Sequence, residues 1–319
     1  MDEVSVHERI LSQKQQIVDL WESTGLLRGI VDNLEKEQVA LALDSQRTIN
    51  ETHGDLKEVT EFFNEYFPYL KRVSIPIVRR VINPSSFIGF QIGSVQTMMG
   101  AEHSIAYRDL YGNIRSRAVK AKTASLQRMP SRPSSEDHNL DAEAEACAEY
   151  AEWLVNKMNV EVINDVARNA PTTSEHQWKN RDDLEAHLRM TMGRVEKQGG
   201  RQPTWILTTP QLASTLLEQD EFDIKSFHRG AMGRQKVYAH PSCQEGTILV
   251  GHKGDFYSSG YFYCPYVTLF ISPVKIPGLN VREERIMSRY GKAMPFPEFY
   301  GRIQVHGYSP NNEENEEDG

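Results

Sequence analysis

The sequence contains few cysteines, no long apolar run and no excess of basic residues. Three cysteines, Cys147, Cys243 and Cys264, are scattered over 319 residues, which excludes a disulfide framework and indicates a reducing compartment. No apolar run approaches the roughly 20 residues that a membrane-spanning helix needs, so we expect no membrane partner. The formal net charge is -8, whereas a domain that reads DNA sequence is more often basic. The composition therefore argues against secreted disulfide-rich, membrane-spanning and sequence-reading DNA-binding proteins.

Residues that could carry catalysis or bind a metal are few and poorly spaced. His240 and Cys243 have ligand-like spacing, but His252 and Cys264 are separated from them by turns, and no Cys-x-x-Cys pair is present. Cys243 beside a histidine is a candidate nucleophile, yet no oxyanion motif flanks it. We therefore expect no enzyme activity and no cofactor. A metalloenzyme built on His240, Cys243 and Cys264 remains the weakest alternative.

Apolar residues recur at helical spacing in several stretches, which predicts helices within an α+β protein. Residues 1–67 read as a polar, helical arm. The clearest helix covers residues 141–170, where an apolar stripe follows an acidic first turn. A second helix is predicted over residues 182–197, and a third begins at Thr209 with Pro210 in its first position.

Short runs of β-branched and aromatic residues predict strands in much of the remaining chain. Alternation around Ile114 and Ala118 suggests a hairpin with a loose return. Residues 171–180 are polar and are predicted to form a loop. Strands are predicted at residues 205–207, 236–239, 247–250, 261–263, 266–270 and 300–305.

Four short motifs occur in a fixed order between residues 236 and 291. They are KVYAHP, LVGHKG, GYFYCPYV and SRYG. In this order and at this spacing, they resemble the C-terminal half of the T-even-type phage major capsid protein family. The resemblance covers about residues 68–305 and implies the Hong Kong 97-type capsid fold.

The resemblance also implies a division of the chain into the domains of that fold. Its parts are an N-terminal helical arm or prohead segment, a peripheral domain in three pieces with a long spine helix, an extended loop, an axial domain and an acidic disordered tail. The expected ranges are 1–67 for the arm, 68–108, 139–200 and 273–305 for the peripheral domain, 109–138 for the extended loop, 201–272 for the axial domain and 306–319 for the tail.

The function implied by the resemblance is assembly of a virus shell. The chain would form hexamers and pentamers of itself, in the host cytoplasm, and become the icosahedral capsid of the virion. Expected partners are portal and scaffold proteins, decoration proteins, and packaged double-stranded DNA bound without sequence specificity. The alternative with the same fold is an encapsulin-like compartment that holds a cargo enzyme.

Five basic residues are candidates for contacts between subunits. Arg79 and Arg80 could pair with carboxylates of a neighbouring copy, although a solvated pair is the more common role for two adjacent arginines. Arg115, Arg117 and Lys120 belong to the expected extended loop, which would lie across the next subunit.

A maturation cut is a further expectation that the resemblance raises. The family's protease cuts after a glutamate placed two residues beyond a bulky apolar residue, and Glu51 fits by position. Thr52 follows, however, where the family usually has a smaller residue. Sequence alone therefore leaves Glu51 as the candidate cleavage site and slightly favours an uncleaved protein.

Overall fold

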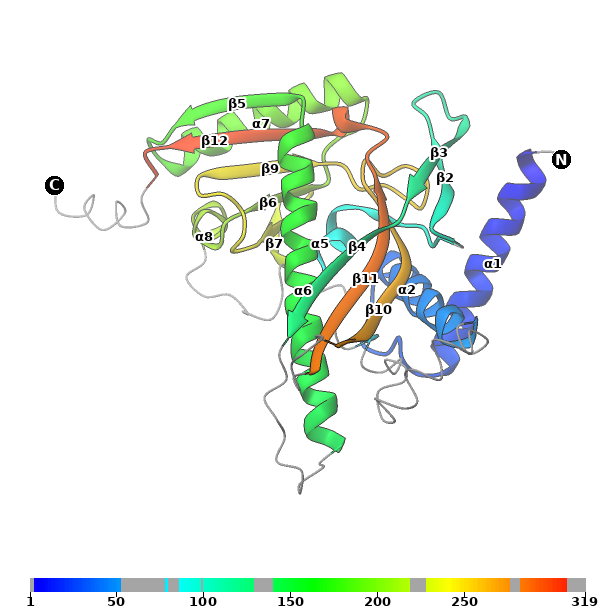
Figure 1. Cartoon of the computed structure of the whole chain (residues 1–319). Helices are drawn as coiled ribbons and strands as arrows, with labels where there is room; N and C mark the ends of the chain where they lie inside the picture. Colours follow the sequence, from blue (N-terminus) through cyan, green and yellow to red (C-terminus); the bar gives the residue numbers. More distant parts are fainter. Residues whose placement is uncertain are drawn as a thin grey trace.

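A long helix between two β-sheets organises the chain (Figure 1). The computed structural model describes residues 3–52, 78–79, 86–98, 100–128, 140–218, 228–275 and 282–308. Helix α6 (Leu140–Asn169) confirms the helix predicted over residues 141–170. Its apolar stripe is buried at Leu154, Met158 and Val166, as helical spacing requires. Because α6 contacts strands of both sheets, it holds the two halves of the molecule together.

The first sheet has four strands in the order β1-β10-β11-β4. Its centre is the antiparallel pair β10 (Phe262–Lys275) and β11 (Arg282–Ala293). Strand β4 (Lys122–Arg128) pairs antiparallel with β11, and the short β1 (Ser94–Val95) pairs parallel with β10. The runs predicted separately at residues 261–263 and 266–270 form one continuous strand, because its register shifts at an irregularity without ending the pairing.

The second sheet has six strands in the order β5-β12-β9-β6-β8-β7. The strands predicted at residues 205–207, 236–239, 247–250 and 300–305 are all confirmed within it. Its strands are β5 (Thr172–Gln177), β6 (Trp205–Thr208), β7 (His228–Met232), β8 (Gln235–Ala239), β9 (Thr247–Gly251) and β12 (Tyr300–His306).

Strand β5 corrects one prediction, because residues 171–180 were expected to form a loop. The segment is polar and only Thr172 and His176 are buried in it, so it lacks the apolar alternation that marks a strand. Its backbone pairs parallel with β12 from Thr172 to Gln177. Tertiary pairing at the edge of the sheet, rather than local preference, therefore makes this segment a strand.

Both faces of the six-stranded sheet are buried. Helices α7 (Arg181–Gly199) and α8 (Pro210–Leu217) cover one face, where they pack on Ile206, Ile248 and Val250. Both helices confirm predictions, and the predicted cap of α8 is present, since Leu212 N–H donates to Thr209 Oγ1 at 3.5 Å. Residues that alternate with these, among them Trp205, Leu207 and Leu249, face the opposite way and join the main core.

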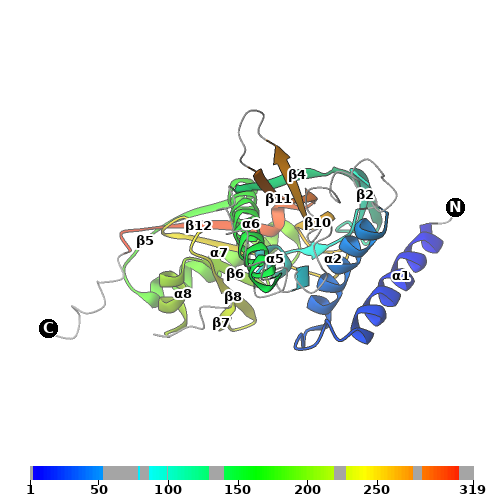
Figure 2. The ribbon, with the colours of Figure 1, turned by 60° about the horizontal axis from the view of Figure 1, so that its bottom comes forward.

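Two helices precede the sheets and pack against them. Helix α1 (Glu3–Ser23) and helix α2 (Asn33–Thr52) confirm the helices predicted over these residues. Residues 24–32 form the turn between them, and residues 53–67 of the expected arm lie outside the described residues. Figure 2 shows α1 on the outside, with α2 between α1 and the body of the molecule. Trp21 and Leu27 are buried against α2 and its surroundings. None of the described helices is both long and apolar enough to cross a membrane.

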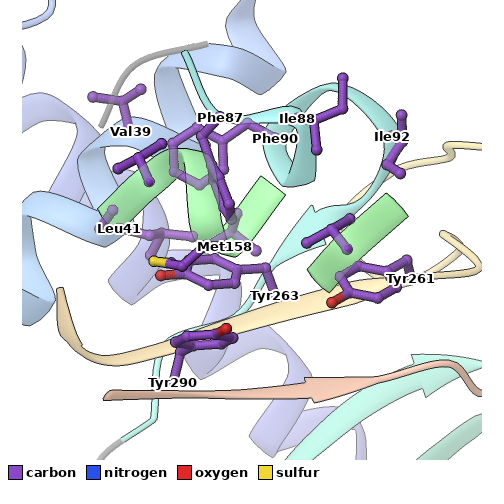
Figure 3. Close-up of a cluster of buried hydrophobic side chains, with 14 of the residues drawn as sticks. Val39, Leu41, Phe87, Ile88, Phe90, Ile92, Met158, Tyr261, Tyr263 and Tyr290 are labelled. Atoms are coloured by element: carbon purple, nitrogen blue, oxygen red, sulfur yellow. The ribbon is translucent and has the colours of Figure 1, made fainter. Parts of the chain in front are cut away.

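The main core forms where α2, α6 and the four-stranded sheet meet (Figure 3). Val39 and Leu41 come from α2, Met158 from α6, and Tyr263 and Tyr290 from neighbouring strands. The short helix α5 (Ile88–Ile92) closes this core. Its flanking Phe87 ring stacks edge-on against that of Tyr263, with centroids 4.7 Å apart. The buried side chains therefore join segments that are far apart in the sequence into one body.

Candidate assembly interface

The long helix is fixed to the four-stranded sheet by a cluster of charged groups. Glu161 on α6 accepts hydrogen bonds from Lys122 on β4 and from the Tyr290 hydroxyl on β11, the latter at 2.7 Å. Lys292 on β11 pairs with Asp165 one turn further along α6. Burial would raise the pKa of Glu161, but the hydrogen bonds from Lys122 and Tyr290 outweigh it and hold this pKa below its usual value. The carboxylate therefore stays ionised and links the helix to two strands.

A second polar contact connects α6 to the short helix α5. The side chain of Asn159 is fully buried, and its oxygen accepts from Ile88 N–H at 2.9 Å while its nitrogen donates to the Ser86 carbonyl at 2.9 Å. The oxygen and the nitrogen of this side-chain amide thus each have a hydrogen-bond partner within the chain. Together with the Glu161 cluster, this contact makes α6 a rigid rib with fixed neighbours on two sides.

A hairpin is present around Ile114 and Ala118, but its second strand is the preceding segment, residues 102–108, and not the return expected after residue 121 (Figure 1). It forms a two-stranded sheet of its own and packs on the four-stranded sheet through Ile105 and Val119. Strands β2 (Glu102–Arg108) and β3 (Ile114–Lys120) pair only with each other among the described strands. The expected extended loop of residues 109–138 starts within the turn of this hairpin, and its β4 segment lies in the four-stranded sheet. Asp109 shapes the turn, since its Oδ1 accepts from the N–H groups of Tyr111 and Asn113 at 3.0 and 2.8 Å.

The three basic candidates on this hairpin each have a partner within the chain. Arg115 Nε donates to Asp109 Oδ2 at 3.1 Å, and Lys120 Nζ lies 2.8 Å from Glu102 Oε1. Arg117 Nη1 donates to the Met294 carbonyl at 3.0 Å. All three side chains are on the surface of the hairpin, where such contacts contribute little to stability.

Sequence reasoning missed the most exposed apolar feature of the hairpin. Leu110 and Tyr111 occupy its turn, and they are 46% and 91% exposed. We call these two residues the hairpin tip. The sequence signal for this feature was the pair of apolar residues before Gly112, because turn positions are usually polar. Gly112 ends the turn with a φ of +89°. The hairpin tip, rather than the basic residues of the hairpin, is therefore the stronger candidate for a contact with another subunit.

Of the two adjacent arginines, Arg79 lies close to the N-terminal helices. Arg79 Nε donates to the Leu26 carbonyl in the turn after α1 at 2.7 Å, and its partial burial lowers the pKa of the guanidinium. Arg80 lies outside the described residues. Glu51 is in the last turn of α2, and its side chain is likewise not described. Arg79 thus has an intramolecular role in the subunit.

The residues considered for metal or thiol chemistry are dispersed in the fold. No group of three or more His, Cys, Asp or Glu residues in the described part of the chain is arranged to hold a metal ion. Burial raises the pKa of the Cys243 thiol to about 12, and it also raises that of Cys264. Both thiols are therefore protonated at neutral pH and poor nucleophiles.

Comparison with solved structures supports one fold. Over 71% of this chain and 93% of the other, the protein superposes on a chain from Mycobacterium phage Bobi with 12% identity and a TM-score of 0.51. A chain from Mycobacterium phage Adephagia gives 10% identity, coverage of 72% and 93%, and a TM-score of 0.52. A chain from Microbacterium phage Oxtober96 gives 12% identity, coverage of 70% and 92%, and a TM-score of 0.52. The shared fold is the mixed α/β capsid fold of Hong Kong 97 type.

Comparison with sequence families gives a more specific result. No curated protein sequence matches the chain. Residues 108–316 match the family described as major capsid protein Gp23. This range includes the hairpin turn, α6, the six-stranded sheet and strands β4, β10 and β11 of the four-stranded sheet. This match decides in favour of a phage head over a cargo compartment or a metalloenzyme. The chain therefore belongs to the Gp23 family of major capsid proteins, and it is a structural protein of a tailed-phage head, located in the virion, rather than an enzyme.

Proposed function

We propose that the chain forms the hexamers and pentamers of an icosahedral head, with the hairpin tip as a principal contact between neighbouring subunits. Closed rings of one chain need heterologous contacts, in which a patch on one copy meets a different patch on the next. The hairpin suits this role because it projects from the body and carries Leu110 and Tyr111 at its turn. Exposed apolar side chains on a projection favour burial against another surface.

The basic residues of the hairpin have a secondary role in this proposal. Arg115 and Lys120 are paired with Asp109 and Glu102 within the subunit. Exposed ion pairs can exchange partners at low cost, and these residues, with Arg117, can also meet carboxylates of the next subunit. Arg80 stays a sequence-based candidate for such a contact, whereas Arg79 acts within the chain.

The two larger sheets support an assignment of the axial and peripheral domains within the subunit. The six-stranded sheet with α7 and α8 corresponds to the axial domain, which would meet its copies at the centre of the capsomer. The four-stranded sheet with α6 corresponds to the peripheral domain. In this assignment β5, α7 and β12 belong to the axial body with which they pair, rather than to the peripheral pieces of residues 139–200 and 273–305.

Partners other than further copies of the chain follow from the same proposal. A scaffold and a portal would organise the shell, decoration proteins would bind outside it, and double-stranded DNA would fill it without sequence recognition. The net charge of -8 suits the last of these, because an acidic wall does not hold the packaged DNA in place.

The test replaces the two apolar side chains of the hairpin tip by serine, a change that should not affect the fold of the subunit. The double variant Leu110→Ser, Tyr111→Ser is compared with Val31→Ser, which removes an apolar side chain that is 93% exposed elsewhere on the surface. We expect the double variant to keep the wild-type melting temperature yet form no closed shells by electron microscopy and sedimentation velocity. Val31→Ser should assemble normally. If the folded double variant forms normal shells, the hairpin tip is not a principal contact between subunits.

A further inference from the structure

Strand β10 has an irregular segment in the middle of the four-stranded sheet. Its register with β11 shifts between Pro265 and Val267 and again between Val267 and Phe270. Pro265 has no N–H to donate, and a bulge leaves backbone groups without their ladder partners. Buried backbone groups of this kind need partners from elsewhere, since each one left unsatisfied is costly. The segment at residues 265–269 therefore depends on another element.

That element is helix α2, which precedes β10 by more than 200 residues. Ser45 Oγ donates to the Tyr266 carbonyl at 2.9 Å, and Gln46 Oε1 accepts from Leu269 N–H at 2.8 Å. In the other direction, Thr268 Oγ1 donates to the Ala42 carbonyl at 2.8 Å. Gln46 is 1% exposed, so water does not reach this contact in its place. Helix α2 thus completes the hydrogen bonding of the bulge.

The same helix is anchored a second time, near its start. Gln38 Nε2 donates to the Gly93 carbonyl at 2.7 Å, and Gln38 Oε1 lies 3.4 Å from the buried ammonium of Lys253. Lys253 also donates to the Phe90 carbonyl. One end of α2 is therefore bonded to the loop beside α5, and the other to the bulge of β10.

Apolar burial adds to these polar contacts. Val39, Ala42 and Leu43 are at most 1% exposed, and they pack in the main core with Phe87 and Phe90 (Figure 3). Removing α2 would uncover this surface together with the groups of the bulge. Each of these apolar side chains contributes to stability through its burial, so the loss would be large compared with the stability of an ordinary domain.

We propose that α2 is a permanent part of the shell subunit, that Ser45 and Gln46 are positioning residues which fix the bulge of β10, and that the bond after Glu51 is not cut during maturation. The proposal rests on the chain being a shell protein. It does not follow from the family match, which begins at residue 108 and leaves α1 and α2 outside it. It follows instead from the bonds between α2 and β10. A cut after Glu51 would sever the covalent link to a helix that the sheet needs.

The first test is the mass of the subunit in infectious particles. Mass spectrometry of the chain extracted from purified heads should recover peptides from residues 12–46 in the same molar amount as peptides from residues 140–218. A chain that begins at Thr52, with the α2 peptides lost from the particles, would overturn the proposal. Heads that do not contain the chain at all would instead contradict its role as the shell protein, so the two failures are distinguishable.

The second test addresses Gln46 directly. Gln46→Met keeps the size of the side chain but removes the acceptor for Leu269 N–H. The control is Gln15→Met, because Gln15 is exposed on α1, where its side chain donates to the exposed Asp19 at 2.8 Å. Hydrogen exchange at the Leu269 amide should be at least tenfold faster in Gln46→Met and unchanged in Gln15→Met. Equal exchange in both variants and the wild type would refute the role assigned to Gln46.

Discussion

The buried His240 should make the protein lose stability in mild acid. His240 follows β8 and is 3% exposed; its Nδ1 accepts from Ser242 N–H at 3.0 Å. Burial lowers the pKa of His240 from its ordinary value of 6.5 to about 4. The unfolded ring thus takes up its proton near pH 6.5 and the native ring only near pH 4. Between these values the unfolded state binds more protons, so stability falls as the pH falls.

The size of this effect follows from the two pKa values. A tenfold difference in proton affinity corresponds to about 1.4 kcal/mol, so lowering the pH from 7 to 4 removes about 3 kcal/mol through His240. The contribution is fully present above pH 6.5. For a chain of this length, each kcal/mol moves the melting temperature by about 2 °C, which gives a loss of about 6 °C.

The assay compares the wild type with His240→Asn on the unassembled protein. An asparagine can still accept from Ser242 N–H, yet it does not titrate. Melting is followed by the tryptophan fluorescence of the chain, to which the buried Trp205 on the neighbouring strand β6 contributes, at pH values from 7 down to 4.5. Below this range carboxylates such as Glu161 and Asp255, whose pKa values are also lowered, begin to contribute.

The expected result is a shallower decline for His240→Asn than for the wild type between pH 6.5 and 4.5. Other histidines with lowered pKa values, such as His187 and His252, are present in both proteins, so the difference isolates His240. His306→Asn serves as the control, because His306 is half-exposed on β12. If the melting temperatures of the wild type and His240→Asn decrease by the same amount over this pH range, burial does not lower the pKa of His240 as described.

Three further predictions concern packing and the contacts of α6, all measured by thermal and urea denaturation. Tyr290→Phe removes the hydroxyl that donates to Glu161 and should cost about 1–2 kcal/mol, and a double-mutant cycle with Lys122→Met should show coupling through the shared carboxylate. Asn159→Leu leaves the Ile88 N–H and Ser86 carbonyl without their partner and should cost at least about 2 kcal/mol, whereas a loss below about 0.5 kcal/mol would contradict the role of Asn159. Gly251→Ala places a Cβ 2.3 Å from the Trp205 ring and should destabilise by about 1–3 kcal/mol, while Gly193→Ala, in an open part of α7, should stabilise by about 0.5–1 kcal/mol; the same sign for both would contradict the packing argument.

The sequence predicted the elements whose residues are apolar at regular spacing. Helix α6 and strands such as β9 have this property, because the burial that forms them also sets their pattern. Strand β5 was missed because its polar residues form a strand only when β12 lies alongside. That partner is more than 120 residues away and leaves no mark on the local pattern.

The role of α2 was hidden for a related reason. Gln38, Ser45 and Gln46 read as polar positions of a solvated helix, yet all three are buried. Their partners are backbone groups of loops and of the β10 bulge, which carry no side-chain signal in the sequence. The hairpin tip was missed because the charged residues of β3, such as Arg115 and Lys120, gave the more familiar pattern, whereas Leu110 and Tyr111 are two isolated apolar residues in the turn before it.

The order of strands in the six-stranded sheet has a consequence for synthesis of the protein. Strand β12 lies between β5 and β9, although it is the last of the described strands to leave the ribosome. Until it arrives, β5 has no neighbour and the inner edge of β9 is open, so the sheet cannot close on a nascent chain. The six-stranded sheet is therefore complete only after residues 300–306 have been synthesised, and nascent chains that lack them cannot present the finished subunit surface to one another.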